Sequence, residues 1–298
     1  MIVFLTGGTG FVGRSVLRTL RGEGHHVRCL VRPGSERHLP TRDGVEVVPG
    51  DVTVPGVWMK AVEGCDAVIH LVGIIREFPG RGITYERLLV QGTRNVLDAA
   101  RAGGVSRHLQ MSALGTRPGA VSGYHRTKWQ AEEAVRGSGL RWTIFRPSII
   151  FGPEDEFVNM LARMIRRLPI VPVIGDGRFR LQPVAVEDVA VGFVRALSLE
   201  TTVRQTYFVA GPEPYDFNRL LDLIGDALGR PRVRKLHYPI ALIRPLVAAL
   251  QRLPFFPLTS DQLTMLEEEN VADPTSFAQT LGIALTSFPD GIRRYLKG

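Results

Sequence analysis

The chain has 298 residues, of which 44% are hydrophobic, and it carries a formal net charge of +8 that comes almost wholly from arginine. This length suits one large α/β domain or two smaller ones. No apolar run is long enough to span a membrane, and two cysteines are too few for a disulfide framework or a zinc cluster. We therefore expect buried thiols, a reducing compartment and no metal site. The arginines are scattered without interleaved aromatic residues, which argues against a nucleic-acid surface.

The first twenty residues predict a strand, a glycine-rich turn and a helix. Residues 2–6 are apolar, residues 15–20 fit a helix, and the turn between them reads Thr6-Gly7-Gly8-Thr9-Gly10-Phe11-Val12-Gly13. Gly7 allows a tight turn with positive φ, Gly10 lets a pyrophosphate lie against the backbone, and Gly13 lets the helix pack close to the strand. Free N–H groups at the helix N-terminus favour phosphates. The turn therefore predicts a dinucleotide cradle from Gly7 to Gly13, and the alternative is a glycine-rich loop without a ligand.

Apolar runs alternate with helical stretches up to about residue 150. We expect strands at 27–31, 45–48, 67–72, 108–111 and 142–145, and helices at 84–102 and 124–135. This alternation implies a parallel sheet with right-handed crossovers. We predict an α/β fold with a Rossmann-type doubly wound parallel sheet in residues 1–150. Residues 151–298 are expected to form a smaller, mainly helical substrate-side region interleaved with the end of the sheet.

The second half of the chain has more proline and more helical spacing. We expect helices at 155–168, 187–199, 216–228 and 261–269, and short strands near 178–186 and 205–209. The stretch Pro239 to Leu253 has one apolar helical face, and we predict a core-packing helix there. The alternative is a helix that lies on a membrane or a partner protein, which basic charge assists. The residues of this face and its flanks are Ile243, Leu246, Val247, Leu250, Arg244, Arg252, Phe255 and Phe256.

The end of the second strand bears on the choice of cofactor. A fold that prefers NAD usually has an acid about twenty residues past the glycines, on the ribose hydroxyls. Arg32 stands there instead and offers a cation to a 2′-phosphate, with Arg14 and Arg37 nearby in the sequence. We therefore expect NADP(H) in preference to NAD(H). The alternative is that Arg32 is an ordinary surface residue.

Two further strand ends supply candidate cofactor contacts. Asp51 follows the third strand, where its carboxylate would accept a hydrogen bond from the adenine amino group while Val52 packs nearby; the alternative is an ordinary turn aspartate. The fourth strand ends at Leu71, Val72 and Gly73, at the carboxyl edge where ligands bind in such sheets.

A Y-x-x-x-K pair lies at the start of the helix at 124–135. The i, i+4 spacing puts Tyr124 and Lys128 on one helical face. A lysine cation beside a phenol lowers the phenol pKa, so we expect Tyr124 to act as acid or base, and Lys128 also to bind the nicotinamide ribose. Ser112 closes the fifth strand and is a candidate to bind a substrate carbonyl; the alternative is a strand-end cap.

These motifs together resemble the short-chain dehydrogenase/reductase superfamily, in particular its extended and atypical members related to the sugar-nucleotide epimerases. The resemblance covers about residues 1 to 215. It implies that Pro147 and Ile149 lie against the nicotinamide amide. The matching segments, in order, are Thr6 to Gly13, Ser112, Tyr124 to Lys128, Arg146 to Pro153 and Val186 to Ala190.

One departure distinguishes a subgroup. The superfamily usually has N-x-x-G-T in the helix at 84–102, but Leu89 replaces the asparagine here, and Asn95 lies on another face. The segment at 151–159 resembles the G-x-E-D-x-F-x-N stretch of the NDUFA-nine-like proteins, the accessory nucleotide-binding subunit of respiratory NADH:ubiquinone oxidoreductase and its bacterial relatives. So does Ser112-Ala113-Leu114-Gly115. Members of that subgroup need not be catalysts.

The sequence therefore supports two alternative functions. The first is an NAD(P)(H)-dependent oxidoreductase or epimerase that uses Tyr124, Lys128 and Ser112 on a small-molecule carbonyl or alcohol. The second is a non-catalytic dinucleotide-binding accessory or sensing subunit that docks on a protein complex or makes a peripheral membrane contact through Pro239 to Phe256. A redox-sensing regulator similar to the NmrA-like proteins is less favoured, because those usually lack the tyrosine–lysine pair. We expect a cytoplasmic protein, with a peripheral position at the inner face of the membrane as the alternative.

Overall fold

The computed structural model describes residues 1–251 and 258–296 of the chain. These residues form two compact units. The first consists of Met1–Pro147, Val186–Val209 and Thr275–Ala284. The second consists of Ser148–Ala185, Ala210–Pro274 and Leu285–Gly298, apart from residues 252–257 and 297–298, which the structure does not describe. The chain therefore leaves the first unit after Pro147 and returns to it twice. Within the described residues, no helix is both long and apolar enough to cross a membrane.

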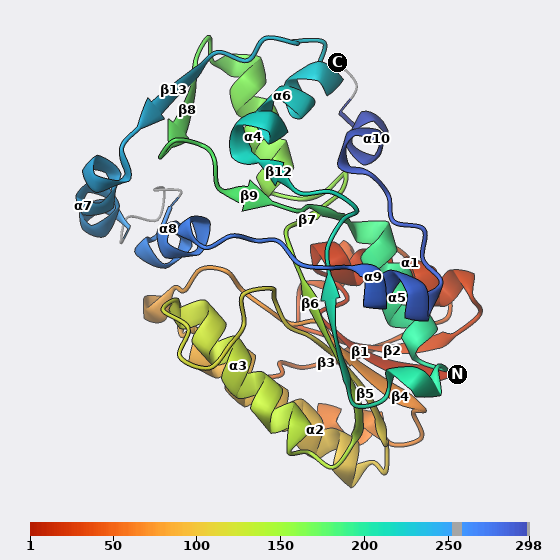
Figure 1. Cartoon of the computed structure of the whole chain (residues 1–298). Coiled ribbons are helices and arrows are strands. Elements are labelled where there is room, and N and C mark those ends of the chain that lie inside the picture. The colour runs from red at the N-terminus through yellow and green to blue at the C-terminus, as the bar shows by residue number, and fades with distance from the viewer. Residues whose placement is uncertain (252–257, 297–298) are drawn as a thin grey trace. The chain divides into compact units, whose positions relative to one another are not determined.

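The first unit is built on a seven-stranded sheet in which every neighbouring pair is parallel (Figure 1). The strand order is β11-β6-β5-β4-β1-β2-β3. The direction of winding reverses between β1 and β4, which is the switch point of a doubly wound fold. The predicted Rossmann-type sheet is confirmed. Its strands are β1 (Ile2–Thr6), β2 (His26–Val31), β3 (Val45–Pro49), β4 (Ala67–His70), β5 (Arg107–Met111), β6 (Arg141–Pro147) and β11 (Gln205–Val209).

Helices cover both faces of this sheet. One face carries α1 (Phe11–Gly22), α5 (Val186–Ala196) and α9 (Thr275–Leu281), and the other carries α2 (Gly92–Ala102) and α3 (Gly123–Arg136) (Figure 1). Successive side chains of a strand point to opposite faces. In β6, the ring of Phe145 accordingly packs 4.4 Å from that of Phe193 in α5, while Ile144 joins the apolar cluster beneath α2 and α3.

The helix expected at 84–102 is divided in two. Glu86–Gln91 forms a π-helical segment, and the regular helix α2 begins only at Gly92. The Thr93 hydroxyl donates to the Leu89 carbonyl oxygen at 2.6 Å, a side-chain bond that competes with regular helical pairing. A π-helical turn widens a helix locally and is often found at functional sites. Leu89, the departure from the family pattern, lies inside this turn.

The second unit has its own apolar core. It centres on α4 (Phe157–Arg167), α6 (Phe217–Ala227) and α10 (Phe288–Arg293), and includes Phe151, Leu220 and Phe288. Four of its short strands and two of the chain's helices, α9 and α10, were not expected from the sequence, since they are too short to show a clear period. The strand pairs are β7 (Ile150–Phe151) with β10 (Val184–Ala185), β9 (Arg180–Leu181) with β12 (Tyr215–Asp216), and β8 (Val171–Ile174) with β13 (Lys235–Tyr238).

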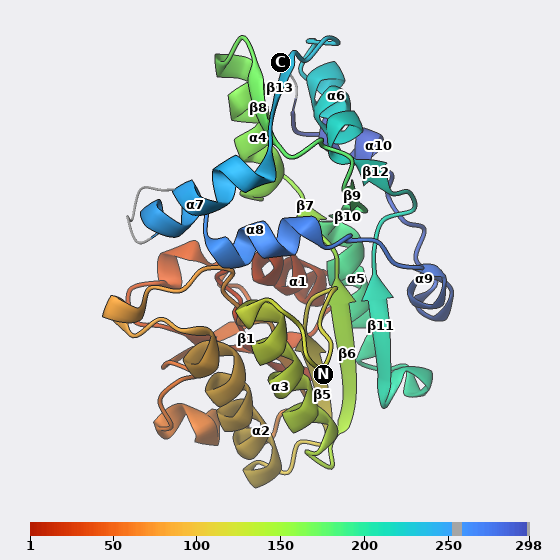
Figure 2. The ribbon, with the colours of Figure 1, turned by 60° about the vertical axis from the view of Figure 1, so that its left-hand side comes forward.

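The prediction of a core-packing helix at Pro239 to Leu253 is wrong. The helix α7 (Ile240–Leu250) is present, but only Val247 in it is buried and Leu246 is half exposed. Its main helical neighbour is α8 (Ser260–Glu267) (Figure 2). A helix that is apolar on nearly every side has more apolar surface than one neighbouring helix can cover. The flanking residues Arg252, Phe255 and Phe256 lie outside the described residues.

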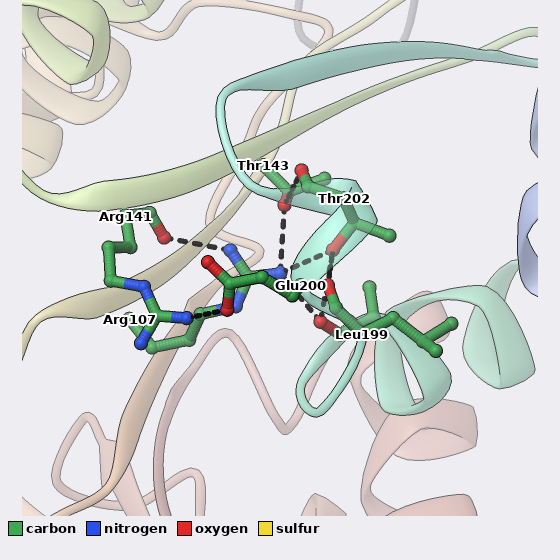
Figure 3. Close-up of polar contacts among 7 residues, drawn as sticks. Arg107, Arg141, Thr143, Leu199, Glu200 and Thr202 are labelled. Atoms are coloured by element: carbon green, nitrogen blue, oxygen red, sulfur yellow. Dashed lines mark hydrogen bonds and ion pairs between the residues drawn. The ribbon is translucent and has the colours of Figure 1, made fainter.

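A buried arginine connects β5 and β6 to the segment before β11 (Figure 3). Arg107 is almost completely buried, and burial lowers its pKa to about 10. Its Nη1 donates to the Arg141 carbonyl at 2.7 Å. Its Nη2 lies within hydrogen-bond distance of three oxygens, which are Thr143 Oγ1 (2.9 Å), Thr202 Oγ1 (2.8 Å) and the carbonyl of Ala196 (2.6 Å). At the rim, the Arg141 side chain pairs with Glu200.

Arg107→Lys is expected to destabilise the protein by about 2 kcal/mol, because a lysine ammonium cannot reach the acceptors on both sides of the guanidinium fork and leaves buried oxygens unpaired. Urea unfolding followed by circular dichroism measures this. The exposed Arg94→Lys in α2 is the matched control and is expected to stay within about 0.5 kcal/mol of the wild type. Equal stabilities of the two variants would contradict the anchoring role of Arg107.

Candidate functional site

The predicted site residues of the first unit follow the carboxyl ends of its parallel strands. Thr6, the last residue of β1, is paired with Leu30 in β2 and with His70 in β4. The segments that come next, after β1, β2 and β4, therefore emerge side by side at the switch point of the sheet, where ligands bind in this architecture. The same edge receives the ends of β3, β5 and β6, which carry the remaining candidates of this unit.

The glycine turn has the geometry of a phosphate cradle. Gly7 has φ +81°, and its carbonyl oxygen accepts a hydrogen bond from the Gly10 N–H at 3.0 Å. A Cβ on Gly13 would lie 2.0 Å from the Gly7 carbonyl oxygen, so only glycine fits there. Gly10 caps α1 without a side-chain hydrogen bond, and the first turn of α1 holds no acid. The helix N–H groups and the exposed Gly10 backbone fit a pyrophosphate.

The flanking residues of the turn differ in what they can offer. Thr9 and Phe11 are half-buried, whereas the Val12 side chain is buried in the core, so only its backbone faces a ligand. Arg32 is exposed directly after β2, and its carbonyl accepts from the Ser35 N–H at 2.9 Å in a tight turn. A cation thus stands at the strand end where an acid would bind ribose hydroxyls.

The two other arginines named with Arg32 sit in different settings. Arg14 is half-buried in the first turn of α1. Arg37 is exposed, and its Nε lies 3.4 Å from His38 Nε2. Arg14 belongs to α1, which precedes β2, and Arg37 belongs to residues 32–38, which follow it.

The loop after β3 is held from α2. The Asp51 Oδ1 accepts from the Thr53 N–H at 2.8 Å, so Asp51 makes the turn contact that was weighed as its alternative role. Val52 is buried, and its carbonyl accepts from the Asn95 side chain at 2.7 Å. Asn95 therefore fixes the position of the Asp51 and Val52 pair. An asparagine within the apolar stripe of a helix was the available signal for this role.

The ends of β4 and β5 meet α3 at Lys128. Its ammonium donates to the Met111 carbonyl at 3.0 Å, and a Cβ on Gly73 would lie 3.4 Å from it and 4.0 Å from Leu89 Cδ2. Lys128 is almost completely buried, and burial lowers its pKa to about 8, against the raising effect of Glu132. Leu89 thus puts a methyl group beside Gly73 and Lys128 where the superfamily has a polar side chain.

Tyr124 lies one helical turn before Lys128. The Lys128 ammonium is 5.9 Å from the centroid of the Tyr124 ring, so the predicted pair is brought together. The Tyr85 ring packs edge-on against Tyr124 at 5.7 Å. Burial raises the pKa of Tyr124 well above its ordinary value, which is opposite to the lowering we expected. The physical reason is that desolvation of the phenolate outweighs the nearby ammonium.

The start of α3 and its middle are both anchored. Ser122 caps the helix, with its Oγ accepting from the His125 N–H at 3.1 Å, which fixes Tyr124 in the first turn. Glu132, one turn after Lys128, is fully buried between Arg136 (2.6 Å) and Arg146 in β6 (2.6 Å). This charge network holds α3 against β6. Neither Tyr85 nor Glu132 carried a sequence signal that we used.

The remaining candidates, Ser112, Pro147 and Ile149, are described by their hydrogen bonds within the protein. Ser112 is buried at the end of β5, where its Oγ donates to Thr116 Oγ1 at 3.4 Å. Pro147 ends β6, and its carbonyl accepts from the Leu114 N–H at 2.8 Å. Ile149 belongs to the second unit, where its N–H donates to Asn270 Oδ1 at 3.2 Å.

The segment that resembles G-x-E-D-x-F-x-N forms a local network within the second unit. The Asp155 carboxylate accepts from the backbone N–H groups of Gly152 (3.2 Å) and Val158 (2.5 Å) and from the Asn159 side chain (3.2 Å). Burial raises the pKa of Asp155, against these hydrogen bonds. The motif therefore serves to start α4.

A family model described as NAD(P)H-binding matches residues 7–161, more than half of the chain. The chain belongs to this NAD(P)H-binding family, among the atypical short-chain dehydrogenases/reductases. This confirms the resemblance drawn from the sequence motifs. The matched range of the NAD(P)H-binding family begins at Gly7 of the glycine turn and includes Tyr124 and Lys128. The cofactor is a nicotinamide dinucleotide.

Two curated relatives resemble this chain in sequence, and one solved structure resembles it in fold. The chain is 32% identical over 285 residues to subunit 9 of the NADH dehydrogenase (ubiquinone) 1 alpha subcomplex of Arabidopsis thaliana, a mitochondrial protein, covering 91% of this chain and 69% of that one. It is 34% identical over 193 residues to a ceramide reductase of Caulobacter vibrioides, covering 65% of this chain and 60% of the relative, which is less than two thirds. A UDP-glucose 4-epimerase structure from Thermotoga maritima shares the fold, with a TM-score of 0.78, 18% identity and coverage of 99% and 97%.

Gly13→Ala is expected to weaken NADPH binding at least about tenfold and to lower Tm, because the new methyl group would displace the Gly7 carbonyl and open the cradle. Calorimetric titration and thermal unfolding measure the two effects. Gly22→Ala, at the other end of α1 with no atom within 4 Å of the new Cβ, is the matched control. It should bind NADPH like the wild type and unfold at an equal or higher temperature. Unchanged affinity in Gly13→Ala would disprove the cradle.

Proposed function

We propose that the protein is an NADP(H)-dependent reductase of a small carbonyl compound. Residues 1–150 would supply the cofactor site, and the second region would shape the substrate side. The observation that carries the proposal is the buried Tyr124–Lys128 pair, with the Lys128 ammonium 5.9 Å from the tyrosine ring and against the backbone of Gly73 at the switch point. A buried pair of this kind at a ligand-binding edge is a candidate for proton transfer.

Each side chain has a distinct role in this proposal. Lys128 would bind the nicotinamide ribose as an ammonium and stay oriented by the Met111 carbonyl. Ser112 would donate to the substrate oxygen, and Tyr124 would deliver the proton to it. When bound, the reduced dinucleotide supplies the hydride that converts the carbonyl to an alcohol. Pro147 and Ile149 would pack against the amide end of the site.

The raised pKa of Tyr124 bears on the direction of the reaction. A phenol that keeps its proton at neutral pH is a general acid rather than a general base. Reduction of a carbonyl needs a proton donor, whereas oxidation of an alcohol needs an acceptor. The burial of Tyr124 therefore supports reduction as the favoured direction of the isolated site.

Preference for NADP(H) over NAD(H) is supported by the exposed Arg32 at the end of β2. A guanidinium matches the geometry and charge of a 2′-phosphate, and no carboxylate follows β2 directly at this position. Asp51 would reach the adenine with the oxygen that its turn contact leaves free, while Val52 packs beneath it. Leu71, Val72 and Gly73 would line the dinucleotide from β4.

A second candidate function is a dinucleotide-binding accessory or sensing subunit that docks on a respiratory complex or a membrane. Leu89 beside Lys128 supports it, because an aliphatic side chain cannot take part in a proton relay. The relative named as an NADH dehydrogenase subunit fits this candidate. The exposed helix α7, within Pro239 to Phe256, is its natural contact surface.

Tyr124→Phe is expected to lower kcat by at least about 100-fold while leaving NADPH affinity within about twofold, because only the transferred proton is lost. Turnover is followed by NADPH absorbance with a panel of carbonyl and quinone substrates, and affinity by titration with NADPH and NADH. Tyr207→Phe, a buried tyrosine in β11, is the matched control and should keep wild-type turnover. Tight binding without any substrate-dependent turnover of the wild type would support the accessory subunit instead. Unchanged kcat in Tyr124→Phe would refute the mechanism.

NADPH affinity is expected to fall as pH rises through about 8. The pKa of Lys128 in the free protein is lowered to about 8, so the ammonium that binds ribose is fully present below this pH and is lost above it. Between about pH 7 and about pH 9 the dissociation constant should rise about tenfold. Calorimetry across this range measures it. Lys128→Met should bind more weakly at neutral pH and lose this slope, and a slope that persists in Lys128→Met would assign the titration to another group.

A further inference from the structure

The two-stranded sheet of β8 and β13 in the second unit has one covered face and one open face. On the covered face, Lys235 pairs with Asp222 at 2.5 Å and His237 bonds Asn218 at 2.9 Å, both in α6. The opposite face follows from the alternation of side chains in a strand. It carries Leu236 and Tyr238, which remain exposed within the described part of the chain.

Two segments next to this sheet in the chain also carry exposed apolar side chains. A Cβ on Gly175, which follows β8, would lie 3.2 Å from Ile240 Cδ1, so the first residue of α7 lies close to the end of β8. Figures 1 and 2 show α7 following β13 near this end of the sheet. Six large apolar side chains in these segments are 39% to 67% exposed, half of the twelve that are exposed in the described residues. We call them the apolar face: Leu168, Ile170, Leu236, Tyr238, Leu242 and Leu246.

The two segments that carry the apolar face are themselves basic. Residues 160–175 and 227–251 contain eight of the 37 basic residues and none of the 29 acidic ones. Lys235 and Arg244 have acidic partners in α6 and α8, whereas Arg232 and Arg234 are exposed in the segment that leads into β13.

We propose that the apolar face and its arginines dock on an anionic lipid bilayer. Aliphatic side chains with a tyrosine enter the interface between head groups and acyl chains, and arginines bind the surrounding lipid phosphates. The negative charge of such a bilayer complements the exposed Arg232 and Arg234, which lie in a segment without acidic residues. The inference rests on the docking role proposed above and names its partner, and it is independent of the Tyr124 chemistry.

Co-sedimentation with vesicles tests the proposal on the full chain. The wild type should bind vesicles of equal parts phosphatidylcholine and phosphatidylglycerol, bind phosphatidylcholine alone at least about tenfold more weakly, and be released by high salt. Leu242→Glu/Leu246→Glu and Arg232→Gln/Arg234→Gln should each reduce binding at least about tenfold. The matched controls are Val57→Glu/Val121→Glu and Arg42→Gln/Arg94→Gln, which introduce two glutamates in place of apolar residues or remove two arginines at exposed positions of the first unit. Both should bind like the wild type.

NADPH titration of every variant separates this proposal from the cofactor site. Wild-type NADPH affinity together with lost vesicle binding supports the apolar face as the docking surface. If the wild type binds NADPH but does not bind anionic vesicles, or binds neutral vesicles equally well, the bilayer proposal is wrong and the cofactor-site proposal is unaffected. If the wild type does not bind vesicles but self-associates, and Leu242→Glu/Leu246→Glu abolishes this self-association, the partner of the apolar face is a second copy of the chain and the bilayer proposal is wrong.

Discussion

The close approach of α1 to the first turn is the constraint on which the cofactor site depends. Gly13 lies so near the Gly7 carbonyl that even a methyl group would collide with it, and this contact sets where the N-terminus of α1 points. Because β1 is the strand beside the switch point, the same contact determines how the helix N–H groups face the ends of β2 and β4. The positively polarised helix end then lies at the switch point of the sheet, which is the arrangement a pyrophosphate requires.

Burial has opposite effects on the two residues of the candidate catalytic pair. The low dielectric around them disfavours both charged forms, so the phenol of Tyr124 holds its proton more tightly and the ammonium of Lys128 loses its proton more easily. Both shifts bring the site closer to an uncharged state at neutral pH. Glu132, itself neutralised by two arginines, is the remaining electrostatic support of Lys128. A bound dinucleotide would add negative charge at this point and restore the ammonium.

The two compact units divide the physical tasks of the chain. The first has its polar candidates at one edge of a fully covered sheet, where backbone positions are held by strand pairing on both sides. The second has a modest core and an open sheet face. Covering a sheet on one side leaves apolar side chains exposed, and natural proteins usually keep such patches where a surface is to be bound.

The sequence by itself determined the strand–turn–helix start, the parallel sheet and the Tyr124–Lys128 spacing, because each depends on local periodicity or on residues a few positions apart. Only the tertiary structure decided that Asn95 holds the Val52 loop, that α7 is exposed, and that the pKa of Tyr124 is raised. These properties depend on what lies across from a side chain, and residues distant in the sequence supply that environment. Burial, which sets both desolvation and exposure, is a property of packing, and no periodicity in one segment records it.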